Sequence, residues 1–127
     1  MTPGETVLAF VHAIDSHDYA GLEALCAPGH RFVLNGRVID DPAQVRALWE
    51  GWWSLVPEFT TGVEELHEIG GLVVLVMTPR GTHVVRDGRR INQAWSLPVA
   101  VFARVEGGRV VEWREFCDAA PVKSIGL

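Results

Sequence analysis

Apolar residues recur every three or four positions near the start of the chain. Residues 5–15 carry one apolar stripe, which is typical of an amphipathic helix. Asp18 is a suitable N-cap for a second, short helix, and the proline in Ala27-Pro28-Gly29 predicts its end, because proline cannot continue a helix. The first stripe consists of Val7, Phe10, Val11 and Ile14.

A third helix is predicted from Pro42 to about Leu55. Asp41 precedes the proline, and an acidic cap followed by proline at the first helical position marks a helix start. Pro57 predicts the stop. Trp53 is turned about 100° away from its neighbour Trp52. The predicted apolar face consists of Val45, Leu48, Trp49 and Trp52.

The other segments are rich in β-branched and aromatic residues, which predicts strands. A short strand from His30 to Asn35 precedes the third helix, and four longer strands follow it. Glycine-containing turns join these four, and Asp87-Gly88 is a strong hairpin signal. Consecutive hairpins make an antiparallel sheet with helices on one face, so we expect one α+β domain over residues 1–127. The four strands are predicted at 60–69, 72–84, 93–105 and 110–119.

Charge and composition narrow the class of partner. The 127 residues carry a net charge of −5 with a pI of about 5.4, which argues against nucleic acid and against an anionic membrane surface. The N-terminus lacks the basic segment of a signal peptide, and the longest charge-free run, residues 91–103, is shorter than the roughly 20 residues of a membrane helix. We therefore expect a cytoplasmic protein in which Cys26 and Cys117 are reduced.

The C-terminal half resembles a known family. Residues 101–118 read VFARVEGGRVVEWREFCD: an apolar strand, an acidic glycine turn, then Trp113, an aromatic residue and Asp118. This is similar to the closing hairpin of SnoaL-like polyketide cyclases and limonene-epoxide hydrolases, in the nuclear-transport-factor-2-like superfamily. Arg80-Gly81-Thr82-His83 is similar to a stretch common in the cyclases. The resemblance implies a cone-shaped fold, whose strongly curved, mostly antiparallel sheet has its concave face covered by three N-terminal helices.

The resemblance also implies roles for polar residues. Asp118 matches a strand-end aspartate that acts as acid or base in relatives, and desolvation there would favour its neutral form, although it could simply cap the next turn. Asn35 matches a position that binds water or a carbonyl, although Asn before Gly is also a common turn residue. His83 is the third catalytic candidate because histidine titrates in the useful range, with an exposed strand-end position as the alternative.

Aromatic side chains are expected to surround the ligand. A tryptophan-rich helix face is more often core than ligand wall, but in a cone-shaped fold this helix lines the mouth, so both can hold. On a regular strand, Trp113 and Asp118 have opposite parity, which would turn Trp113 outward if Asp118 faces the cavity. The expected ligand-binding residues are His30, Trp49, Trp52, Trp53, Phe102 and Phe116.

Two departures from the relatives limit the chemistry. The epoxide hydrolases place an Arg-x-Asp pair on a central strand, whereas residues 72–79 carry no charge. The ketosteroid isomerases use an aspartate on the strand before the last turn, and residues 98–102 contain none. The chain has no HExxH, GxSxG or glycine-rich phosphate loop, so we expect neither a metal nor a cofactor.

These features together predict an enzyme that applies cofactor-free acid–base chemistry to a small apolar, polycyclic or terpenoid-like molecule. The reaction types within reach are cyclisation, isomerisation and epoxide opening. The alternative is a non-catalytic binding domain of the same fold. We also expect a homodimer through the sheet, because an outer face bearing Trp113 and other apolar residues would expose too large a patch for a monomer. These other residues are Leu97, Val99 and Val101.

Overall fold

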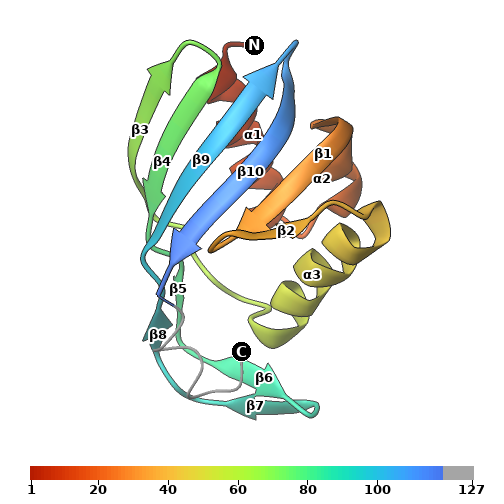
Figure 1. The fold of residues 1–127 in the computed structure, drawn as a ribbon. Coiled ribbons are helices and arrows are strands. Elements are labelled where there is room, and N and C mark those ends of the chain that lie inside the picture. The colour runs from red at the N-terminus through yellow and green to blue at the C-terminus, as the bar shows by residue number, and fades with distance from the viewer. Residues whose placement is uncertain (119–127) are drawn as a thin grey trace.

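The computed structural model describes residues 1–118, which form an α+β fold with three helices and a mixed six-stranded sheet (Figure 1). The strands of this sheet are β1 (Cys26–Leu34), β2 (Arg37–Ile39), β3 (Val63–Ile69), β4 (Leu72–Met77), β9 (Val99–Glu106) and β10 (Arg109–Cys117). Their order is β2-β1-β10-β9-β4-β3, so the sheet is open with β2 and β3 at its edges. The β1–β10 pair is parallel and the other pairs are antiparallel, which confirms a mostly antiparallel sheet.

The predicted helix caps are present. The helices are α1 (Pro3–Asp15), α2 (Tyr19–Ala24) and α3 (Pro42–Leu55). Asp18 accepts a hydrogen bond from the backbone of α2, and Asp41 does the same for α3. Thr2 and Glu5 form a capping box at the start of α1. No helix among residues 1–118 is long and apolar enough to cross a membrane.

The core lies between α1 and the sheet. Figure 1 shows α1 crossing behind β4, β9 and β10. The four residues of the predicted stripe are all buried, and the ring of Phe10 stacks on Trp113 with 4.3 Å between ring centroids. The inner face of the sheet, which α1 covers, is therefore the apolar face.

The expected outer position of Trp113 is wrong. Trp113 is fully buried against α1, and the apolar residues of β9 share its face. The parity argument itself holds, but Trp113 rather than Asp118 occupies the inner side, because its large ring fills the space beside Phe10. Leu97, Val99 and Val101, which were expected outside, are also buried.

Two predicted strands are interrupted by proline. The segments predicted at 72–84 and 93–105 break at Pro79 and Pro98, because proline cannot donate to a sheet ladder. The chain between them forms an extension that projects beyond the sheet near α3 (Figure 1). Its strands are β5 (Arg80–Gly81), β6 (Val84–Arg86), β7 (Arg89–Ile91) and β8 (Trp95–Ser96). Trp95 anchors the extension by packing edge-on against Trp52 of α3, with 5.5 Å between centroids.

The first strand is longer than predicted, and β2 was missed. Ala27-Pro28-Gly29 does not end a helix but lies within β1, whose register with β10 shifts between Cys26 and Arg31. This irregularity accommodates the proline. Asn35 and Gly36 then take positive φ angles of 49° and 85°, which make the tight turn into β2.

Candidate active site

A cavity of about 640 Å³ lies between α3 and the inner face of the sheet. Its walls are mainly apolar, with side chains from β1, β9, α3 and the segments that lead into the extension. Phe32 and Leu34 line it from β1, Val99 lines it from β9, and Trp49 and Trp52 line it from α3. A space of this volume accommodates a small organic molecule.

A single row of side chains crosses the sheet at this cavity. Leu34 of β1 pairs with Glu115 of β10 on one side and with Arg37 of β2 on the other. Glu115 in turn pairs with Val101, and Val101 with Leu75. Cross-strand partners point to the same face of a sheet, so Glu115 and Arg37 share the inner face with buried aliphatic residues. The register thus brings charged groups onto an otherwise apolar wall.

Among the described residues that line the cavity, Glu115 is the acidic one. The indole Nε1–H of Trp113 donates a hydrogen bond of 2.8 Å to its carboxylate. Burial raises the pKa of Glu115 because the charged form is poorly solvated there, and the indole hydrogen bond opposes this rise. Among the described residues, Glu115 forms no ion pair. A carboxyl group in this setting is suited to donate and accept a proton.

Cys117 follows Glu115 on the same face of β10. Burial, together with the nearby charge of Glu115, raises the pKa of its thiol. The neutral thiol is a poor nucleophile. Cys117 is therefore part of the cavity wall rather than a candidate for covalent catalysis.

Asn35 lines the cavity, but its amide is used by the backbone. Its Nδ2 donates to the Cys117 carbonyl at 3.0 Å, and its Oδ1 accepts from the Cys117 backbone N–H at 3.0 Å. Asn35 thereby extends the β1–β10 pairing beyond the last residue of β1. The structure brings it close to Glu115, whose carbonyl accepts from the Asn35 backbone N–H. Its role in binding water or a carbonyl stays a prediction.

The structure does not bring Asp118 and His83 into this lining. Asp118 follows the last residue of β10 and its side chain is exposed, so the expected dry environment is not found there. His83 is buried rather than exposed; its Nδ1 lies 3.4 Å from the Thr82 hydroxyl and its carbonyl accepts from the Trp95 indole. The catalytic roles of these two residues stay predictions.

Only two of the six expected ligand-binding residues, Trp49 and Trp52, line the cavity. Trp53 is buried and donates its indole N–H to the Ile14 carbonyl at 2.9 Å. His30 is buried with its Nδ1 2.8 Å from the Val110 carbonyl, and burial lowers its pKa.

Phe102 and Phe116 were expected to line the cavity, but both lie on the outer face of the sheet. Their rings pack edge-to-face at 5.8 Å, and the guanidinium of Arg114 lies over both. Arg114 and Phe102 are register partners, as are Phe116 and Ala100, so this face is opposite to that of Trp113 and Glu115.

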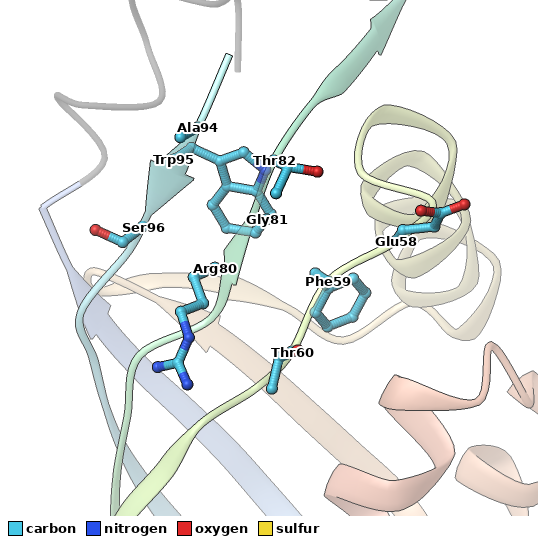
Figure 2. A pocket seen from close by; sticks show the side chains of 9 residues that line it. All are labelled: Glu58, Phe59, Thr60, Arg80, Gly81, Thr82, Ala94, Trp95 and Ser96. Carbon is cyan, nitrogen blue, oxygen red and sulfur yellow. The ribbon is translucent and has the colours of Figure 1, made fainter. Parts of the chain in front are cut away.

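A second depression, of about 680 Å³, lies beside the extension (Figure 2). Phe59 lines both this depression and the cavity. Gly81 is required here, since a Cβ would lie 2.7 Å from the Trp95 Nε1 atom. Figure 2 shows the side chains of Arg80 and Glu58 pointing away from the Trp95 ring. The charged groups therefore do not converge, and the cavity with Glu115 is the stronger candidate site.

Glu115 was missed by sequence reasoning, although a signal for it existed. It follows Trp113 by two residues, so a regular strand places both on one face. The choice of Asp118 rested on the family pattern and on the expected desolvation of a carboxylate at the end of an apolar strand. Once Trp113 is assigned to the inner face, Glu115 becomes the carboxylate that shares this face and lines the cavity.

Comparison with known proteins agrees with this architecture. The model of the SnoaL-like domain family matches residues 7–113. AclR from Streptomyces galilaeus, a proposed hydroxylase, has a TM-score of 0.84 and 21% identity over 97% of this chain and 93% of its own. IdmH from Streptomyces antibioticus, a proposed polyketide cyclase, has a TM-score of 0.84 and 23% identity over 100% of both chains.

A third solved structure, an LEH-like epoxide hydrolase from M. tuberculosis, has a TM-score of 0.73 and 18% identity over 96% of this chain and 86% of its own. No curated protein matches the chain. At these identities the solved structures show a shared fold and leave the chemistry to be argued from the cavity.

Proposed function

Because the chain belongs to the SnoaL-like domain family, we propose that it is a cofactor-free acid–base enzyme in which Glu115 transfers the proton. The substrate is a small, apolar, cyclic molecule enclosed between α3 and the sheet. One observation carries the proposal: a carboxyl group with a raised pKa projects from β10 into an apolar cavity of about 640 Å³. Burial of this kind tunes a carboxyl group toward proton transfer near neutral pH.

The chemistry that fits this site is ring closure or isomerisation of a carbonyl compound. As a base, Glu115 removes a proton from a carbon next to a carbonyl. In ring closure, that carbon bonds to a second carbonyl of the same molecule, whose oxygen then receives the proton. The ring closure involves no net oxidation or reduction, so it requires no cofactor. Epoxide opening, which the relatives' names also suggest, requires an activated water, and the Asn35 amide is already engaged by Cys117.

A non-catalytic binding domain remains the second candidate, favoured by the mainly apolar lining. The test uses a small bicyclic ketone, 2-tetralone, whose α-protons exchange with D₂O when a base removes them. We expect the wild type to accelerate this exchange and Glu115→Gln to lose about 10²–10⁴ of the acceleration. Quenching of tryptophan fluorescence should show unchanged ketone binding. A wild type that binds the ketone without accelerating exchange would favour the binding domain.

We propose, further, that two copies associate through the outer face of the sheet, although on residues other than those expected. Phe116 is 40% exposed and packs on Phe102, next to Arg114. An apolar surface with an arginine at its centre is typical of a protein interface.

A further inference from the structure

Arg37 stands at the end of the row that contains Glu115. Leu34 lies between the two, paired with each of them. With about 5 Å between neighbouring strands, the backbones of Arg37 and Glu115 are about 10 Å apart on the same face. Both residues line the cavity. The cavity is thus lined by Arg37 on the exposed edge strand β2 and by the half-buried Glu115 on β10, with the apolar Leu34 between them.

The guanidinium of Arg37 is unpaired within the described part of the chain. No carboxylate of residues 1–118 lies within ion-pair distance of it, and none of the hydrogen bonds formed there involves it. Within residues 1–118, two arginines form ion pairs: Arg31 pairs with Glu112 at 3.8 Å, and Arg46 pairs with Glu50 at 2.7 Å. Arg37 and Glu115 form no ion pair with each other. As far as residues 1–118 are concerned, the charge of Arg37 is available to a ligand.

We propose that Arg37 is an anion-binding subsite, and that the ligand is an apolar ring system carrying a carboxylate. The carboxylate binds Arg37, and the rings lie over Leu34 toward Glu115. This assignment rests on the proposed function, which it extends by naming the class of ligand. Arginine suits the role because its planar fork binds a carboxylate through two parallel hydrogen bonds.

The test compares two probes of the same size and shape, 2-naphthoate and 2-naphthamide, by titration of tryptophan fluorescence at low ionic strength. Trp49 and Trp52 line the cavity and report on binding. We expect the wild type to bind the carboxylate at least about tenfold more tightly than the amide. Arg37→Gln should remove this preference while leaving amide binding unchanged, and Arg37→Lys should retain part of it.

Arg31→Gln is the matched control, because Arg31 lies on β1 but pairs with Glu112 rather than lining the cavity. It should keep the wild-type preference. Equal affinity of the two probes for the wild type, or a preference that survives Arg37→Gln, would overturn the subsite while leaving the acid–base proposal standing, since 2-tetralone carries no charge. If neither probe binds, the subsite is overturned together with the ligand-binding role of the cavity.

Discussion

Trp113→Phe separates the packing of the indole from its hydrogen bond to Glu115. The shorter ring keeps the contact with Phe10 but leaves a void of roughly 40 Å³, which at about 24 cal/mol per Å³ costs about 1 kcal/mol. The variant also loses the 2.8 Å hydrogen bond to the carboxylate. Such a bond contributes about 1.5–3 kcal/mol when the acceptor is charged and about 0.5–1.5 kcal/mol when both groups are neutral.

The free energy of unfolding should therefore depend on pH in a particular direction. The pKa of Glu115 in the folded protein is raised by burial. Its contribution to stability is full below the ordinary carboxyl pKa and is lost as pH rises through the folded pKa. Removing the indole donor raises the folded pKa further, so Trp113→Phe should cost more at about pH 9 than at about pH 5, by about 1 kcal/mol.

Urea unfolding of the wild type and the variant at both pH values measures this difference. Other ionisable groups titrate alike in both proteins, so their contributions cancel when the two free energies of unfolding are subtracted. Two other tryptophans are matched controls. Trp53 donates to a backbone carbonyl, and the buried Trp49 Nε1 has no hydrogen-bond partner within residues 1–118, so neither indole is bonded to a carboxylate there. Trp53→Phe and Trp49→Phe should have pH-independent costs. A Trp113→Phe cost that is equally constant would refute the coupling between the indole and Glu115.

Three further predictions test the packing, a buried histidine and the assembly. Gly81→Ala should destabilise the fold, because the added Cβ would clash with Trp95. Gly51→Ala in α3 should stabilise the fold by about 0.5–1 kcal/mol, because a Cβ there would meet no atom of the described residues and alanine favours the helix. Thermal unfolding of the two variants measures both effects. Burial lowers the pKa of His30 in the folded protein, so its contribution to the free energy of unfolding should be lost as pH falls below the ordinary histidine pKa. Urea unfolding of His30→Gln should therefore show a smaller loss of stability between about pH 7 and about pH 5 than the wild type shows. Phe116→Glu should convert the proposed dimer to a monomer in analytical ultracentrifugation, with Glu65→Gln on edge strand β3 as the control, and a wild-type monomer at micromolar concentration would contradict the dimer.

Helix caps, an apolar helix stripe and a tight turn depend on residues close together in the chain, and these features were predicted from the sequence. Asp18 and Asp41 cap helices where expected, and the stripe on α1 is the buried one. Asp87-Gly88 makes the predicted turn, but within a short hairpin of the extension rather than between two long strands. Pro79 and Pro98, which break those strands, are visible in the sequence, and a proline is itself a signal against an uninterrupted sheet ladder.

The candidate site was harder to predict because it depends on contacts between distant residues. The register that places Leu34 beside Glu115 joins β1 to β10, which are separated by more than 70 residues in the chain, whereas Arg37 joins the row through the short β1–β2 hairpin. Trp113 faces inward because Phe10, on the first helix, stacks on it. The bonding of Asn35 to Cys117 likewise depends on parallel pairing of the first and last strands of the sheet. Asn35-Gly36 is a local signal for the β1–β2 hairpin, but the β1–β10 pairing and the contact of Trp113 with Phe10 leave no local pattern in the sequence.

The most direct test of the central claim is the rate of 2-tetralone proton exchange in two carboxylate variants measured side by side. Glu115 lines the cavity, whereas Asp118 is exposed and lies outside its lining. We expect Glu115→Gln to lose about 10²–10⁴ of the acceleration and Asp118→Asn to keep most of it. A Glu115→Gln variant that exchanges protons as fast as the wild type, with Asp118→Asn inactive, would contradict the assignment of Glu115 and return the acid–base role to Asp118.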